Sequence, residues 1–143
     1  MEQEGGGWTT IQRRVDGSVD FRRDWAEYKK GFGHPSGEYW LGLDHIHTIT
    51  NSFANVMLRI EASAFNGDRA VLVFEKVFVC DEANLYRLMC GQFVDGEPSL
   101  ANSWLMMNGM AFSTKDVDND QHSIWKCAVT RLTIIAALSK DKK

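Results

Sequence analysis

Three aspartates alternate with other residues in the segment KDVDND. Carboxylates two positions apart, here Asp116, Asp118 and Asp120, can converge on one hard cation, because Ca²⁺ prefers oxygen ligands. The segment is not an EF-hand: counting from Asp116, the sixth position is Gln121 where glycine is needed, and the twelfth is Cys127 where glutamate is needed. The residues themselves leave two interpretations open, a calcium site and a solvated acidic turn.

The histidines and cysteines do not form a recognisable catalytic or zinc motif. His45 and His47 fall on opposite sides of the local register, and no serine or cysteine lies in a nucleophile-elbow sequence. Cys80, Cys90 and Cys127 are odd in number and lack CxxC spacing, which argues against a zinc site and against a complete disulfide framework. We therefore expect no enzyme, and we expect Cys80 and Cys90 to be buried as small apolar side chains.

Hydrophobic periodicity predicts the elements that position these residues. Phe21, Trp25 and Tyr28 stand at i, i+4 and i+7, which indicates an amphipathic helix from Asp20 to Lys30, closed by a glycine. A second short helix is expected from Asp44 to Ile49, with its isoleucines turned inward. Strands are expected at Trp8–Val15, Val56–Glu61, Val71–Val79, Tyr86–Cys90 and Arg131–Leu138.

Turn signals and apolar runs complete the expected architecture. The segment FNGD predicts a two-residue hairpin turn, because Asn-Gly supplies positive φ angles, whereas FVDGEPSLANSW is interpreted as a loop. The strands AVLVFEKVFV and LTIIAAL are apolar on both faces, so we expect them to be central strands of a packed sheet; the alternative is self-association through them. The fold class is α+β, a twisted and mostly antiparallel sheet flanked by short helices, in a single domain spanning 1–143.

Composition narrows the possible partners. The 143 residues carry a net charge of -3, which leaves no basic excess for nucleic acid. The run LTIIAAL is too short to cross a bilayer, and the start MEQEGGG has neither the basic nor the apolar region of a signal peptide. We therefore expect no nucleic acid partner, no membrane insertion, and expression of this chain in the cytoplasm.

Several long motifs resemble one extracellular family. The segments GGGWTTIQRR, GHPSGEYWLG, LRIEASAFNGDRA and NGMAFSTKDVDND are similar to the fibrinogen-like domain, closest to its angiopoietin and ficolin types, and the resemblance covers roughly Gly5 to Asp120. It implies a non-enzymatic module that binds protein receptors or glycans outside the cell. It also implies that the first main strand pairs with the last, and that Trp8 and Ile11 fill the core.

The resemblance also bears on the aspartate loop. In fibrinogen-like domains this loop is a calcium site, which implies Asp118 and Asp120 as side-chain ligands and main-chain carbonyls near His122 and Ile124. We expect any calcium affinity to be weak, because the spacing before Cys127 is one residue longer than is usual in the family.

The sequence departs from the family pattern after the aspartate loop. Cys127 runs almost directly into VTRLTIIAAL, so the lobe that carries the ligand pocket in family members has no counterpart here. We therefore expect ligand binding to be reduced or lost. The alternative is an engineered minimal scaffold without a native biochemical activity, which would explain unpaired cysteines in a module of extracellular type.

Overall fold

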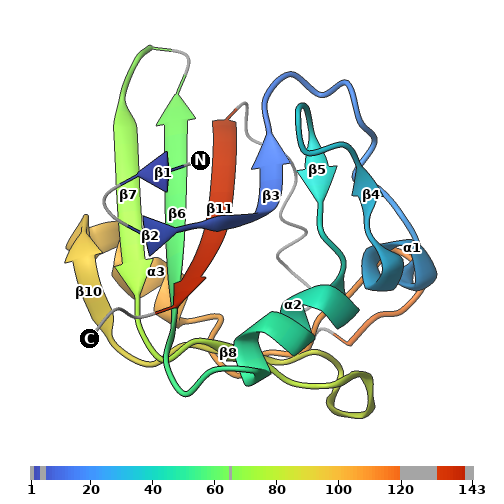
Figure 1. Cartoon of the computed structure of the whole chain (residues 1–143). Helices are drawn as coiled ribbons and strands as arrows, with labels where there is room; N and C mark the ends of the chain where they lie inside the picture. The colour runs from blue at the N-terminus through green and yellow to red at the C-terminus, as the bar shows by residue number, and fades with distance from the viewer. Residues whose placement is uncertain (1, 4–5, 65, 120–131, 141–143) are drawn as a thin grey trace.

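A seven-stranded sheet organises the chain. The structure is a computed structural model that describes residues 2–3, 6–64, 66–119 and 132–140 (Figure 1). All strand pairs in the described residues are antiparallel. The order in the large sheet is β10 (Phe93–Gly96), β7 (Arg69–Phe74), β6 (Val56–Ala64), β11 (Leu132–Lys140), β3 (Thr9–Arg14), β5 (Tyr39–Trp40) and β4 (Phe32–Gly33). Two-stranded sheets are formed by β1 (Glu2–Gln3) with β2 (Gly6–Gly7) and by β8 (Phe78–Val79) with β9 (Leu88–Met89).

The last strand lies in the middle of the sheet. β11 pairs with β3 on one side, where Ile134 faces Arg14, and with β6 on the other, where Ile134 faces Ala62. The predicted pairing of the first and last main strands is therefore confirmed. Both apolar strands, β7 and β11, have neighbours on each side, and Leu138 of β11 is 1% exposed. The prediction of central strands is therefore confirmed for both, and Leu138 is the residue of β11 whose burial the structure describes.

The hairpin between β6 and β7 forms where Asn-Gly predicts it, but its loop is wider than two residues. Ser63 pairs with Arg69, and Ala64 N–H donates to the carbonyl of Asp68 at 2.8 Å. Gly67 adopts a φ of 93°, which side chains other than glycine rarely tolerate. The turn chemistry was predicted correctly, and its length was not.

The first helix, α1, spans Trp25–Lys30 and begins later than the predicted Asp20. Asp20 Oδ1 accepts a hydrogen bond from Arg22 N–H at 2.8 Å, and Arg23 Nε donates to the Asp20 carbonyl at 2.6 Å. These local bonds hold the segment before α1 in a turn, because a short acidic side chain competes with helical hydrogen bonds. The expected closing glycine is confirmed: its N–H donates to the Glu27 carbonyl at 2.8 Å.

The second helix, α2 (Leu43–Asn51), confirms the predicted helix from Asp44 and fixes strand β8. Ile46 is buried, at 3% exposure. Thr50 Oγ1 accepts from Val79 N–H at 3.0 Å, and the Val79 carbonyl accepts from His47 Nδ1 at 2.7 Å and Asn51 Nδ2 at 2.8 Å. Side chains of α2 thus satisfy both main-chain groups of Val79. His47, considered for catalysis or zinc, serves here as a structural hydrogen-bond donor.

Two strand predictions need correction. The run from Val71 to Val79 is not one strand, because β7 ends at Phe74 and the chain turns at Lys76, whose φ is 53°. Asn55 Oδ1 accepts from Lys76 N–H at 3.0 Å and satisfies this turn. The strand expected at Tyr86–Cys90 shrinks to β9, which pairs with β8 outside the large sheet. Between β8 and β9 lies a short 3₁₀ helix, η1 (Glu82–Asn84).

A third helix, α3 (Pro98–Leu105), occupies part of the segment that was interpreted as a loop. Proline at its start suits the first helical turn, where a missing N–H costs nothing. Ala101 is 1% exposed, and the Trp104 ring stacks near Phe74 of β7 with centroids 6.4 Å apart. Figure 1 shows α3 behind β7 and β6, so the helix covers this part of the sheet. Packing of Ala101 and Trp104 against the sheet therefore stabilises a helix that local sequence patterns do not predict.

The cysteines of the described residues are unpaired. Cys90 is 7% exposed and Cys80 is half-buried, and both are free thiols. In the β8–β9 register Val79 faces Leu88, so the two cysteines do not stand opposite each other. The prediction of buried cysteines holds fully for Cys90 and only partly for Cys80, and Cys127 lies outside the described residues.

Candidate functional site

The aspartate loop is attached to the start of helix α1. Asp116 Oδ1 accepts hydrogen bonds from the main-chain N–H of Trp25 at 2.9 Å and from Thr114 Oγ1 at 2.7 Å. Lys115 Nζ lies 3.2 Å from Asp24 Oδ1, the residue before the helix. The hydrogen bond from Thr114 lowers the pKa of Asp116, and the Trp25 N–H lowers it further, so this carboxylate is ionised at neutral pH. Asp116 therefore serves as an anchor between two segments.

The structure places only part of the predicted calcium site. Asp118 is an exposed residue of the loop, next to the anchored Asp116. The other predicted ligands, Asp120, His122 and Ile124, lie outside the described residues. Within the described ranges, no three acidic, histidine or cysteine side chains gather as metal ligands. The chemistry of Asp118, an accessible carboxylate on an anchored loop, fits a hard cation.

An aromatic cluster supports this loop from beneath. The Phe112 ring lies 5.3 Å from that of Tyr28 and 6.2 Å from that of Trp40, measured between centroids. Phe112 N–H donates to the Leu85 carbonyl at 2.9 Å, and its own carbonyl accepts from Asn119 Nδ2 at 2.8 Å. Phe112, which precedes the aspartates, and Asn119, which lies between Asp118 and Asp120, are thereby joined beside the core.

A second group of polar contacts joins α1, α2 and the η1 turn. Glu82 accepts from Trp25 Nε1 at 2.9 Å and forms an ion pair with Lys29. Tyr86, 2% exposed, donates its hydroxyl to Asp44 Oδ1. Burial raises the pKa of Tyr86, and the hydrogen bond to Asp44 raises it further, so the phenol stays protonated. These contacts hold the elements that border the aspartate loop together.

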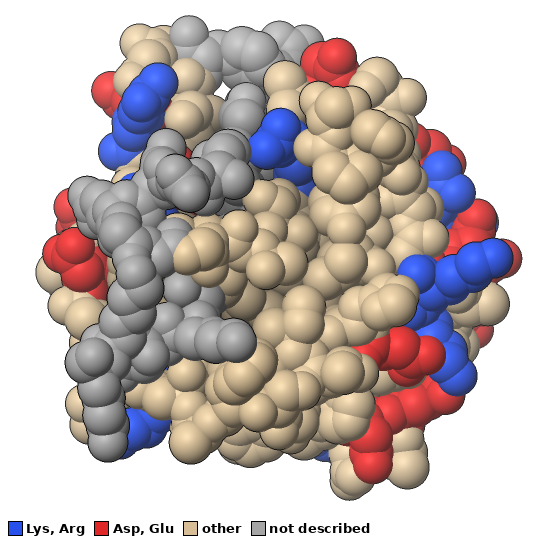
Figure 2. All heavy atoms as spheres, viewed as in Figure 1, with Lys and Arg blue, Asp and Glu red and all other residues tan. Residues whose placement is uncertain are grey.

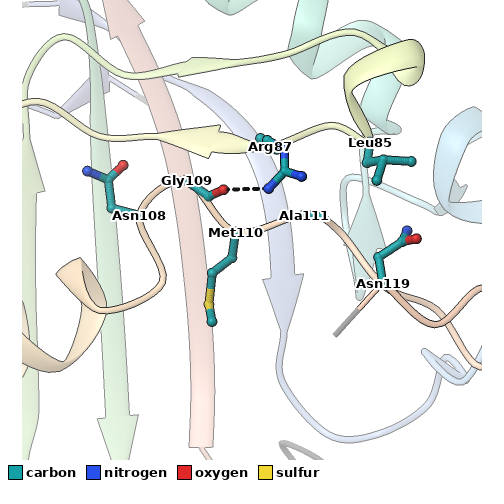
Figure 3. A pocket seen from close by; sticks show the side chains of 7 residues that line it. All are labelled: Leu85, Arg87, Asn108, Gly109, Met110, Ala111 and Asn119. Atoms are coloured by element: carbon teal, nitrogen blue, oxygen red, sulfur yellow. Dashed lines mark hydrogen bonds between the residues drawn. The ribbon is translucent and has the colours of Figure 1, made fainter. Parts of the chain in front are cut away.

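A pocket of about 400 Å³ opens beside the loop. It is lined by Leu85, Arg87, Asn108, Gly109, Met110, Ala111 and Asn119. Arg87 Nη1 donates to the Gly109 carbonyl at 2.9 Å, and Figure 3 shows the guanidinium between Gly109 on one side and Leu85 and Asn119 on the other. Leu85 and Tyr86 have φ angles of 57° and 47°, a left-handed conformation that costs energy in residues with side chains. Sequence patterns do not indicate this pocket, because its lining comes from separate segments of the chain.

Glu38 is a buried carboxylate that sequence reasoning also missed. It is 2% exposed, and its Oε1 accepts main-chain hydrogen bonds from Val15 at 2.8 Å, Asp16 at 3.0 Å and Gly17 at 2.8 Å. Its Oε2 accepts from Val19 at 2.9 Å. Burial raises the pKa of Glu38, but these four N–H groups overcome that effect and lower it to about 2. Glu38 therefore shapes the turn after β3. The available signal was a glutamate directly before the aromatic residues of β5, Tyr39–Trp40.

Charged side chains are unevenly distributed on the visible face. Figure 2 shows acidic and basic residues gathered along the side where α1 lies in Figure 1, while the middle of this face carries few charges. The two signs are mixed, which agrees with the net charge of -3. Each helix in the described ranges is too short or too polar to span a membrane.

Comparisons with known proteins identify the family. Residues 1–134 match the family described as fibrinogen beta and gamma chains, C-terminal globular domain. Angiopoietin-1 of Mus musculus and of Homo sapiens are each 47% identical over 131 residues, which cover 90% of this chain and 25% of the relative. The chain thus spans about a quarter of the length of these relatives. It belongs to the fibrinogen C-terminal globular domain family.

Solved structures agree with this assignment. The fibrinogen-like globe domain of human ANGPTL6 matches with a TM-score of 0.83 and 30% identity, covering 98% of this chain and 81% of that chain. The corresponding domain of human ANGPTL2 gives a TM-score of 0.82 and 26% identity, covering 98% and 83%. The lamprey fibrin D-dimer complexed with the peptide Gly-His-Arg-Pro-amide gives 0.74 and 31%, covering 85% and 42%. The α+β fold class is therefore confirmed.

Proposed function

We propose that this chain is a non-enzymatic recognition module of the angiopoietin type, which binds a protein receptor outside the cell. One observation carries the proposal: 47% identity to angiopoietin-1 extends over 90% of the chain. The described loops support it, because long-range contacts hold the aspartate loop and the η1 turn in place. Preorganised loops suit recognition, since little ordering entropy is lost on binding.

We further propose that receptor affinity is reduced relative to a complete fibrinogen-like domain. We infer from the sequence after Cys127 that the family's ligand-pocket lobe has no counterpart there, so that part of the contact surface would be missing. Peptide recognition supports the general mode of binding, because a related fold from lamprey is complexed with a short peptide. Glycans are the second class of partner that the family resemblance implies.

Competition on cells tests the proposal. A labelled fibrinogen-like domain of angiopoietin-1 is bound to cells that capture it, and this chain is added as the unlabelled competitor. We expect displacement at a concentration at least about tenfold higher than that needed by the unlabelled angiopoietin-1 domain, a difference of about 1.4 kcal/mol. Capture of the chain on N-acetylglucosamine beads measures the glycan alternative.

Each outcome has a defined meaning. Absence of competition at a hundredfold molar excess of the chain over the labelled domain would contradict receptor recognition. Competition as strong as that of the angiopoietin-1 domain would contradict the proposed loss of contact surface. A heat-denatured sample of the same chain is the control for non-specific displacement.

We also propose that the aspartate loop binds calcium weakly, through Asp118 and Asp120. Asp116 is engaged with Trp25 and Thr114, and Asp118 is an exposed carboxylate in the same loop. The carboxylates would hold the ion, and the ion would relieve the repulsion between closely spaced like charges on one segment.

A minimal scaffold without native activity is the alternative. The observation that favours it is the pair of free thiols, Cys80 and Cys90, in a chain whose relatives belong to a family of extracellular type. A scaffold of this kind would fold without any disulfide, and the competition experiment would then show no displacement.

A further inference from the structure

The pocket beside the aspartate loop contains a cation whose hydrogen bonds are only partly used. A guanidinium carries five N–H donors in a planar fork. Arg87 donates one of these N–H groups to the Gly109 carbonyl. Among the described residues, no carboxylate forms an ion pair with Arg87. Figure 3 shows the other side of the guanidinium facing the part of the pocket where Leu85 and Asn119 lie.

The residues around Arg87 favour a ligand with a single negative charge. Among the described residues that line the pocket, Arg87 carries the charge, and the amides of Asn108 and Asn119 add polar groups. One positive charge balances one negative charge, and planar carboxylates match the guanidinium fork. A doubly charged phosphate would place two negative charges beside the single positive charge of Arg87, so one of them would not be neutralised in the pocket. The side chains of Leu85 and Met110 provide an apolar border for a small substituent.

The backbone around the pocket is fixed in advance. Asn108 Oδ1 accepts from Cys90 N–H at 2.8 Å, and Gly109 N–H donates to the Leu88 carbonyl at 2.7 Å. The two consecutive left-handed residues, Leu85 and Tyr86, stand immediately before Arg87. Strained backbone persists where the surrounding structure holds it, and such positions are concentrated at binding sites.

We propose that this pocket is a binding site for a monovalent carboxylate, with Arg87 as its recognition residue. The carboxylate can come from the C-terminus of a peptide or from an aspartate or glutamate side chain. This inference goes beyond the proposed receptor function, because it names a small-ligand site and does not require a receptor.

Titration followed by ¹H–¹⁵N NMR tests the proposal. Acetate is the first probe, acetamide its neutral counterpart, and inorganic phosphate at about pH 8, where the doubly charged form dominates, the dianion. We expect saturable shifts of the Gly109, Ala111 and Asn119 amide signals with acetate, and at least about tenfold weaker effects with acetamide and phosphate. N-acetylglycine and N-acetyl-aspartate amide then distinguish a terminal carboxylate from a side-chain carboxylate.

Three variants decide the role of the pocket. Arg87→Gln removes the charge and should weaken acetate binding about tenfold or more, whereas the exposed Arg69→Gln, outside the pocket, should leave it unchanged. Ala111→Leu fills the pocket with Arg87 intact and should weaken binding to a similar degree, which keeps the test decisive if Arg87→Gln does not fold. Unchanged binding in either pocket variant, or tighter binding of phosphate than acetate, would overturn the proposal.

Discussion

Asp116 and Trp25 lie 91 positions apart in the sequence, yet Asp116 Oδ1 accepts a 2.9 Å hydrogen bond from the Trp25 main-chain N–H. The contact satisfies one of the unpaired N–H groups at the start of helix α1. It also fixes the loop in which Asp118 lies. A single side chain therefore couples the stability of a helix terminus to the geometry of the proposed calcium site.

Replacing Asp116 tests this coupling. Asp116→Ala should lower the melting temperature by a few degrees, because it removes the acceptor for Trp25 N–H and for Thr114. Asp116→Asn is the matched control, since it keeps an oxygen acceptor and removes only the charge, and it should retain most of the stability. Circular dichroism melts provide the measurement. Equal loss in both variants would show that charge, and not the hydrogen bond, matters here.

Stability at low pH should depend on Glu38. Its pKa is about 2 in the folded chain against 4.5 for an ordinary glutamate, so its contribution is present above pH 4.5 and is lost as the pH falls toward 2. The shift corresponds to about 3 kcal/mol of unfolding free energy. Glu38→Gln should cost about 2 to 3 kcal/mol at pH 7 and should flatten the pH dependence below pH 5, as measured by urea unfolding.

Glu61→Gln serves as the control for Glu38. Glu61 pairs with Arg59 at 2.8 Å, and its side chain is 31% exposed, so its loss should cost less than about 1 kcal/mol. If both variants lose the same free energy of unfolding, the four main-chain hydrogen bonds to Glu38 do not make the contribution predicted for them.

Calcium should stabilise the chain modestly if Asp118 and Asp120 bind it. We expect a dissociation constant on the order of 10⁻⁴ to 10⁻³ M, and a gain of roughly 2.7 kcal/mol at a hundredfold excess of calcium over that constant. Melting curves in EDTA and in calcium measure the effect. Asp118→Asn and Asp120→Ala should abolish it, whereas Asp116→Asn should not. A shift of equal size in all three variants would identify the segment as an acidic turn only.

The two described thiols should react at different rates. Burial raises the pKa of the Cys90 thiol, and the neighbouring Trp104 side chain only partly offsets this. Cys80 is half-buried and should react with Ellman's reagent at least about tenfold faster, because the thiolate is the reactive form and access to it is needed. The comparison uses Cys80→Ser and Cys90→Ser in a Cys127→Ala background. Equal rates in the two single-thiol proteins would contradict the prediction.

Folding should not require oxidation. Cys80 and Cys90 are free, so the melting temperature should be the same with and without reductant. A transition that moves down on reduction would indicate a disulfide involving Cys127 and would argue against the scaffold alternative.

Much of the architecture could be predicted because its signals are local. The Asn66–Gly67 pair predicts a hairpin turn, and the hairpin forms there with Gly67 at a positive φ angle. Gly31 ends α1 as expected. The pairing of β3 with β11 followed from family resemblance, and the structure confirms it. The calcium ligands remain a prediction, since most of them lie outside the described residues.

Other features could not be read from neighbouring residues. Helix α3 forms where the sequence suggested a loop, because Ala101 and Trp104 pack under the sheet. The strand expected to continue past Phe74 turns at Lys76, which is satisfied by the distant Asn55. In both cases tertiary contacts outweigh local preference, which is weak for short elements.

The sequence by itself determined the apolar strands, the turns and the family motifs, because periodicity and turn chemistry act over a few residues. Only the tertiary structure decided which side chains meet. Glu38 reaches the turn at Val15–Val19, Asp116 reaches Trp25, and Arg87 meets Gly109 in the pocket. These contacts join segments far apart in the chain, and their geometry depends on how the whole sheet and its loops pack together.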